Sequence, residues 1–222
     1  MLTETVQDYL KAIYELQSEH GRAPTNALAD RLGITPASAS LMVKRLAGEG
    51  LVAHEPYRGV ALSPKGRRAA LEMVRHHRLI ERFLADTLSV PWDEVHAEAE
   101  RWEHVLSEDL EQRMDAALGF PTSDPHGSPI PAEDGKLPEA PRYRLSELEP
   151  SEEAVVAEVS DEEPEFLRYV GGLGLYPGAA VKIVATAPFE GPLTVRVDDR
   201  AEHALGREAA HRIRVRDVRS AA

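Results

Sequence analysis

The segment Val95–His104 concentrates side chains that can bind a metal ion. If this segment is helical, His96, Glu100, Glu103 and His104 fall on one stripe, because successive residues are about 100° apart around a helix axis. Four such groups repel one another unless they are solvated, share protons or are neutralised by a cation. Imidazole and carboxylate donors without thiolate suit a divalent first-row metal of intermediate to hard character. A solvated, charged helix face is the alternative interpretation.

A second pair of the same kind, His77 and Glu81, lies one turn apart on the preceding predicted helix. This pair can reach the same space, and two His–Glu pairs on adjacent helices favour a metal site over a solvated face. The pattern is not that of a zinc protease, because no second histidine follows His96 after four residues. A metal-dependent hydrolase remains an alternative, but no nucleophile or oxyanion motif accompanies the cluster.

Composition points to a soluble, cytoplasmic protein. The chain has no cysteine, no apolar run of membrane-spanning length and no signal pattern, so we expect no membrane partner. The net charge of −12 is unevenly distributed, because residues 1–70 carry nine Lys/Arg against seven Asp/Glu, whereas the rest carries 17 against 31. The N-terminal third is therefore the place to look for a nucleic-acid-binding element.

Three short helices followed by a hairpin are predicted in this third. Periodicity, glycine stops and caps indicate helices over 3–19, 25–32 and 36–48, with Thr35-Pro36 starting the third. Helix, short turn and helix again is the helix-turn-helix pattern. On the third helix, small-polar, basic and apolar residues share the outward face, as expected of a recognition helix, although an ordinary surface helix shows the same pattern. The expected DNA-contacting residues are Thr35, Ala37, Ser38, Leu41, Lys44 and Arg45.

The hairpin decides between these two interpretations. Two β-like runs, 51–55 and 60–62, are joined by Pro56-Tyr57-Arg58-Gly59, which predicts the wing of a winged helix with Arg58 placed to contact DNA. Helices over 64–88 and 92–118 follow and offer a surface for pairing with a second copy. A linker over 119–147, rich in Pro and Gly, leads to short β runs typical of a small SH3-like barrel, over 154–159, 180–186, 193–197 and 212–215.

The predicted fold is thus mostly α with a small β domain. We expect a winged helix-turn-helix domain over 1–70, a helical metal-binding and dimerisation domain with linker over 71–140, and an SH3-like domain over 143–222.

Several motifs together resemble the diphtheria toxin repressor family of metal-dependent bacterial transcription regulators. They are the winged helix, His77-Arg78-Leu79-Ile80-Glu81, the 95–104 segment, Gly127-Ser128-Pro129-Ile130-Pro131 and the terminal β module, which is similar to the iron-transport-A-like module. The resemblance covers nearly the whole chain. It implies a homodimer that binds operator DNA, has no small-molecule substrate, is not an enzyme and holds two metal ions per subunit.

The resemblance also implies two ligand sets. One consists of His77, Glu81 and His96 with Glu158 and Asp161 from the β domain, and the other of Asp8, Glu100, Glu103 and His104. His126 and the other histidines are expected to be surface or packing residues. Iron-type members carry Met at the Asp8 position and Cys at the Glu100 position, so this chain is similar to the manganese-type branch. Lys11 departs from that branch, in which a ligating Glu is expected three residues after Asp8.

These features predict a manganese-dependent repressor of manganese uptake genes. Mn²⁺ prefers oxygen donors, and Fe²⁺ is the alternative ion, with Zn²⁺, Co²⁺ or Cd²⁺ as surrogates. An iron- or zinc-responsive regulator of the same family is the alternative function. The ligand set implies that a cation held by Asp8 and by the 95–104 segment restricts the hinge between the DNA-binding and dimerisation domains.

Overall fold

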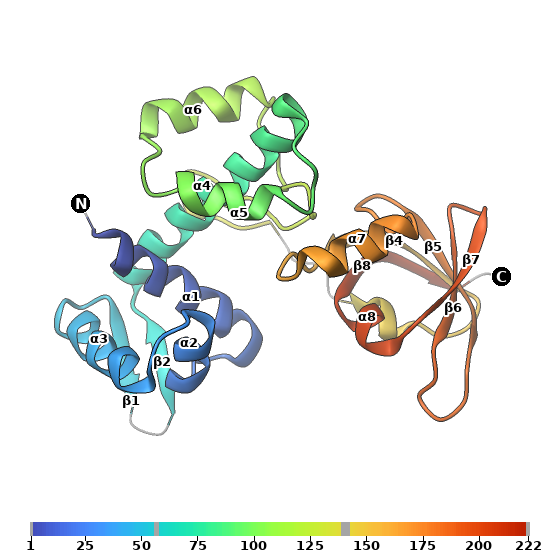
Figure 1. Ribbon diagram of the computed structural model, residues 1–222, viewed down its shortest axis with the longest axis horizontal. Helices are drawn as coiled ribbons and strands as arrows, with labels where there is room; N and C mark the ends of the chain where they lie inside the picture. Colours follow the sequence, from blue (N-terminus) through green and yellow to red (C-terminus); the bar gives the residue numbers. More distant parts are fainter. Residues whose placement is uncertain (1, 56–57, 139–142, 221–222) are drawn as a thin grey trace. The chain divides into compact units, whose positions relative to one another are not determined.

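The computed structural model describes residues 2–55, 58–138 and 143–220. Within these residues there are eight α-helices, a two-stranded sheet and a six-stranded sheet (Figure 1), so the predicted combination of a mostly helical chain with a small β domain is confirmed. The chain forms two compact units. The first unit comprises residues 1–77, 102–107 and 131–136, and the second unit comprises residues 78–101, 108–130 and 137–222.

Three helices and a hairpin make up most of the first unit (Figure 1): α1 (Glu4–His20), α2 (Thr25–Arg31), α3 (Pro36–Gly48), β1 (Val52–Glu55) and β2 (Gly59–Leu62). Helix α1 is amphipathic: its apolar residues recur on one face, where Val6, Leu10 and Ile13 are buried. The hairpin is antiparallel, with Val52 opposite Leu62. Pro56 and Tyr57, which we expected at its tip, lie outside the described residues.

Helix α4 (Pro64–Leu88) has the predicted bounds. The Ser63 Oγ atom caps its start by accepting a hydrogen bond from the Gly66 N–H at 3.0 Å. The predicted helix over 92–118 is wrong, because two helices occupy this stretch: α5 (Val95–Trp102) and α6 (Glu108–Ala117). The first turn of α6 contains three acidic residues, which stabilise a helix N-terminus at this position. Glu103 and His104 therefore lie in the turn between two helices and not on a common helical stripe.

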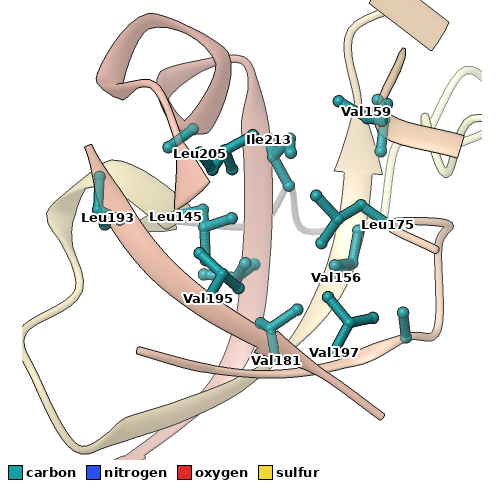
Figure 2. Packing of buried hydrophobic residues seen from close by; sticks show 14 of the residues in the cluster. Leu145, Val156, Val159, Leu175, Val181, Leu193, Val195, Val197, Leu205 and Ile213 are labelled. Carbon is teal, nitrogen blue, oxygen red and sulfur yellow. The ribbon is translucent and has the colours of Figure 1, made fainter. Parts of the chain in front are cut away.

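The β domain lies in the second unit. Its six-stranded antiparallel sheet has the order β3-β8-β4-β5-β6-β7. The elements are β3 (Tyr143–Arg144), the 3₁₀-helix η1 (Leu145–Glu147), β4 (Glu152–Val159), α7 (Pro164–Gly172), β5 (Ala180–Thr186), β6 (Leu193–Val197), β7 (Ala201–Leu205), α8 (Arg207–His211) and β8 (Ile213–Ser220). Alternate strand residues point inward and form one apolar core, in which Val156, Leu175, Val195 and Ile213 are fully buried (Figure 2).

The linker before the β domain is ordered where it meets β4. The Val159 N–H donates to the His126 carbonyl at 2.9 Å, and Gly127 follows with a φ of +91°. A Cβ atom on Gly127 would lie 2.0 Å from the Ala157 carbonyl oxygen, so only glycine permits this approach. None of the described helices is both long enough and apolar enough to cross a membrane.

Candidate metal centres and DNA-binding surface

Helix α3 presents one buried and one exposed face. The Thr35 Oγ1 atom accepts a hydrogen bond from the Ser38 N–H at 3.1 Å, and Pro36 occupies the first turn, as predicted. Ala39, Val43 and Leu46 are buried beneath the helix. All the residues that we expected to contact DNA are exposed, namely Thr35, Ala37, Ser38, Leu41, Lys44, Arg45 and, on the hairpin, Arg58.

Exposed ion pairs hold two of the cationic side chains on this surface. Arg45 Nε lies 2.8 Å from Glu49 Oε1, and Arg58 Nη1 lies 3.5 Å from Glu55 Oε2. Exposed pairs of this kind contribute little free energy, so a DNA phosphate can replace the carboxylate. Leu41 is 72% exposed. An exposed apolar side chain on such a helix suits contact with a thymine methyl group.

Asp8, Glu103 and His104 form the first candidate metal centre, within the first unit. Each offers a donor atom, and these atoms lie within 4.8 Å of one another. His104 Nε2 lies 2.9 Å from Asp8 Oδ1, while its Nδ1 lies 3.0 Å from Gln7 Oε1. Because an amide oxygen only accepts, His104 Nδ1 donates to Gln7, which leaves Nε2 as the donor atom for a cation.

Glu103 also contacts a buried ammonium group. The Lys11 Nζ atom donates to Glu103 Oε1 at 3.0 Å and to Glu103 Oε2 at 2.8 Å, and it lies 2.9 Å from His77 Nδ1. His77 Nδ1 also contacts Glu103 Oε2 directly. Burial alone would raise the pKa of Glu103, but the His77 hydrogen bond and the Lys11 charge outweigh it and lower the pKa below its ordinary value. Glu103 is therefore held as a carboxylate although it is buried.

Glu81, His96 and Asp161, three members of one expected ligand set, are close together in the second unit. His96 Nδ1 lies 3.1 Å from Glu81 Oε1 and 3.8 Å from Asp161 Oδ2. Helix α4 supplies Glu81, α5 supplies His96, and the loop after β4 supplies Asp161. Of the two ligands that we expected from the β domain, Asp161 therefore lies beside the helix residues.

Asp124 and His126 from the linker adjoin the same Glu81, and all three side chains are buried. His126 Nε2 donates to the Trp92 carbonyl at 2.7 Å, so in the neutral ring Nδ1 carries a lone pair. This Nδ1 atom lies 3.9 Å from Glu81 Oε2 and 3.8 Å from Asp161 Oδ2, and has no hydrogen-bond partner. A lone pair that faces carboxylate oxygens in a buried place requires a cation or a proton between them.

The pKa of Asp124 is also affected by the crowding of buried carboxylates at this site. Burial, followed by the nearby Glu81 carboxylate, raises the pKa of Asp124 well above its ordinary value, and the Arg78 guanidinium only partly opposes this. Asp124 Oδ1 accepts two backbone hydrogen bonds, whereas Oδ2 has no hydrogen-bond partner. The carboxylate, imidazole and second carboxylate therefore fit a divalent cation by donor type, burial and unsatisfied donor atoms.

Three further residues were expected to bind metal. Glu158 Oε1 accepts a hydrogen bond from Ser128 Oγ at 3.0 Å, and Glu158 is in none of the groups of metal donors among the described residues. Glu100 lies at the surface, 3.8 Å from His96 Nε2. His77 faces Lys11 and Glu103 within the first unit.

Asp124 and His126 were missed as candidate ligands. His126 was expected to be a surface or packing residue; it is completely buried and lies beside two carboxylates. The available signal was Asp124-Pro125-His126-Gly127, two donor residues separated by a proline and followed by a glycine. That spacing is common in solvated loops, so it carried little weight without the fold.

A winged helix together with buried carboxylate–imidazole clusters defines a metal-dependent DNA-binding protein. Three family models match the chain in succession. Residues 1–60 match the iron dependent repressor N-terminal DNA binding domain, residues 63–132 its metal binding and dimerisation domain, and residues 143–217 the FeoA domain. These matches account for the winged helix and for the terminal SH3-like module.

Known proteins resemble the chain over almost its full length. The iron-dependent repressor IdeR of Mycobacterium tuberculosis (strain ATCC 25618 / H37Rv) is 37% identical, over 98% of this chain and 99% of the relative. A solved manganese-dependent transcriptional repressor in complex with manganese is 43% identical, with a TM-score of 0.87 over 95% of this chain and 98% of that one. ScaR with bound Cd²⁺ is 31% identical, with a TM-score of 0.81 over 95% and 98%.

The chain therefore belongs to the iron-dependent repressor family, which includes the diphtheria toxin repressors. It is a metal-dependent transcriptional repressor and not an enzyme. Its matched domains are those of DNA binding and of self-association.

Proposed function

We propose that this chain is a manganese-dependent repressor that binds operator DNA as a homodimer and shuts off genes for manganese uptake. The donor chemistry of the two clusters carries this proposal. Every candidate ligand offers a carboxylate oxygen or an imidazole nitrogen, and the chain contains no cysteine. Mn²⁺ favours such donors, whereas thiolates and thioethers favour softer ions. The similarity to a manganese-dependent repressor supports the same assignment.

In this proposal, Asp8, Glu103 and His104 hold one ion, with Glu100 as the further ligand that the family resemblance implies. The bound ion supplies positive charge among acidic groups that otherwise repel one another. Asp8 belongs to α1, whereas Glu103 and His104 belong to the turn after α5. Shared ligation fastens α1 to that turn, which limits the motion of the winged helix and favours the recognition-helix spacing that DNA requires.

The second ion is proposed to be held by Glu81, His96 and Asp161 together with Asp124 and His126. The contacts of Glu158 with Ser128 and of His77 with Lys11 favour Asp124 and His126 in their place. These ligands come from α4, α5, the linker and the β domain. Two ions per subunit follow, with one of them joining the linker and the β domain to the helices.

A metal titration of DNA binding tests the function. An operator duplex is selected from a random-sequence pool with Mn²⁺ present, fluorescently labelled, and titrated with metal-free protein at fixed Mn²⁺, Fe²⁺, Zn²⁺ or Co²⁺, with Fe²⁺ handled anaerobically. We expect Mn²⁺ to raise the anisotropy of the labelled operator at the free Mn²⁺ concentrations found in cells. A response to Fe²⁺ or Zn²⁺ without a response to Mn²⁺ would instead support the alternative that the chain's iron-dependent relatives suggest.

A further inference from the structure

Lys11 is a buried cation surrounded by a carboxylate and an imidazole, the side-chain types that commonly bind metal ions. The residue is only 7% exposed, and buried lysines are uncommon because an ammonium loses its hydration on burial. Its Nζ atom lies within 3.0 Å of both Glu103 carboxylate oxygens and of His77 Nδ1. These partners compensate for the burial.

The identity of the partners separates this arrangement from an ordinary buried salt bridge. A simple ion pair needs one carboxylate, but here the ammonium also lies 2.9 Å from an imidazole nitrogen, which itself contacts the same Glu103 carboxylate. Carboxylate oxygen and imidazole nitrogen are the ligand types that a divalent ion takes. Asp8 and Lys11 lie three residues apart on α1, hence on one helix face, and both reach toward the 103–104 turn.

Glu103 is shared between two cation positions. On one side its Oε1 atom lies 3.8 Å from His104 Nε2 and belongs to the donor group with Asp8. Its carboxylate also receives the Lys11 ammonium together with the His77 ring nitrogen. We infer that Lys11 is a built-in cation that occupies the place of a second metal ion beside Glu103.

This inference rests on the proposed metal centre and extends it. The first unit then holds one ion and not a two-ion cluster. Lys11 also holds the Glu103 carboxylate in place through both of its oxygen atoms. The contact of Lys11 with Glu103 also joins α1 to the 103–104 turn.

Metal counting in a chain with one centre removed tests the inference. In full-length protein carrying Glu81→Gln and Asp124→Asn, the second-unit centre loses two ligands, so only the first-unit centre remains. After equilibrium dialysis against Mn²⁺, we expect about one tightly bound ion per subunit with Lys11 in place. We expect about two ions with Lys11→Glu, together with the electron paramagnetic resonance signature of exchange-coupled Mn²⁺ pairs. The same ion count for both proteins, without coupling, would overturn the inference.

A second variant keeps the test decisive if Lys11→Glu folds poorly. Lys11→Met removes the charge but retains the length of the side chain. We expect the metal-free variant to melt at a lower temperature than the parent and Mn²⁺ to raise its melting temperature more than that of the parent. An equal Mn²⁺-induced rise in both proteins would assign Lys11 to packing alone. If the dialysis finds no ion bound to the protein that retains Lys11, the proposed first-unit metal centre is wrong. That result differs from an equal, non-zero ion count in both proteins, which contradicts only the inference about Lys11.

Discussion

The Asp124 carboxylate is destabilised by burial and by the nearby Glu81 carboxylate. Its raised pKa means that the native protein binds more protons than the unfolded chain between the ordinary value of 3.8 and the raised native value. The free energy of unfolding therefore falls as pH rises through this window. A bound cation relieves the same cost.

Asp124→Asn should remove this cost, since an amide carries no charge and retains an oxygen for the two backbone N–H groups. We expect the metal-free variant to be more stable than the parent at pH 8, by on the order of 1 kcal/mol, and to gain less stability on Mn²⁺ addition. Urea unfolding with EDTA at pH 5 and pH 8, repeated with Mn²⁺, measures both effects. A variant that is less stable at both pH values, with an unchanged response to Mn²⁺, would contradict this account.

Asp161 and Glu158 form a matched pair on the β domain, because both were expected ligands and only Asp161 lies in a group of metal donors. Asp161→Ala should lower the Mn²⁺ affinity of one of the two proposed sites roughly tenfold or more, by loss of a charged ligand. Glu158→Gln should change it little, since Glu158 is paired with Ser128 and Arg214. Calorimetric Mn²⁺ titration compares the two variants, and the reverse ranking would reassign the ligand.

At the scale of elements, the wing and α3 make separable contributions to DNA binding. Arg58 stands on the exposed hairpin with only a weak ion pair to Glu55, so its expected role is contact with a phosphate. Arg58→Ala should weaken binding to all DNA sequences alike and reduce the slope of log affinity against log salt by about one. Anisotropy titrations over a salt series check this, with Leu41→Ala as the control. Leu41→Ala should reduce sequence preference and keep the slope.

The helices of the winged-helix region could be predicted because their ends carry local signals. Thr35-Pro36 and Ser63-Pro64 cap α3 and α4 through contacts three residues apart. The break between α5 and α6 was missed, although Ser107 followed by an acidic first turn is a typical helix start. Residues 103–105 include neither Pro nor Gly, and Glu103 instead takes part in a contact with Lys11, 92 residues away.

The β domain shows the same division between local and long-range causes. The strands β5 and β6 are rich in β-branched residues and were predicted with their observed bounds. β7, with the sequence Ala-Glu-His-Ala-Leu, was missed because its residues favour helices, and its strand pairing with β6 overrides that preference. The linker carries no periodic pattern, so its attachment to β4 through His126 could not be predicted either.

At the scale of the whole molecule, metal and DNA must each promote binding of the other. If shared ligation by Asp8, Glu103 and His104 restricts the winged helix, operator DNA must raise the Mn²⁺ affinity by the same factor by which Mn²⁺ raises the operator affinity. Couplings of this kind amount to about 1–3 kcal/mol. Mn²⁺ titrations with and without saturating operator measure one side of this cycle, and metal-dependent anisotropy measures the other.

Asp8→Ala provides the control for this coupling. The variant should still bind Mn²⁺ through the second-unit centre, but its operator affinity should depend on Mn²⁺ much less than that of the parent. Full metal activation of Asp8→Ala would show that the winged helix is restrained in another way.

The donor sets of this chain also bear on survival under oxidants. A thiolate ligand is converted by peroxide first to a sulfenic acid and then to irreversible sulfinic and sulfonic acids, and a thioether is converted to a sulfoxide. The four methionines lie outside the candidate ligands, and there is no cysteine. Peroxide therefore finds no sulfur atom to modify at either centre. We therefore expect the metal-binding side chains of both candidate centres to stay chemically intact when the protein is exposed to peroxide.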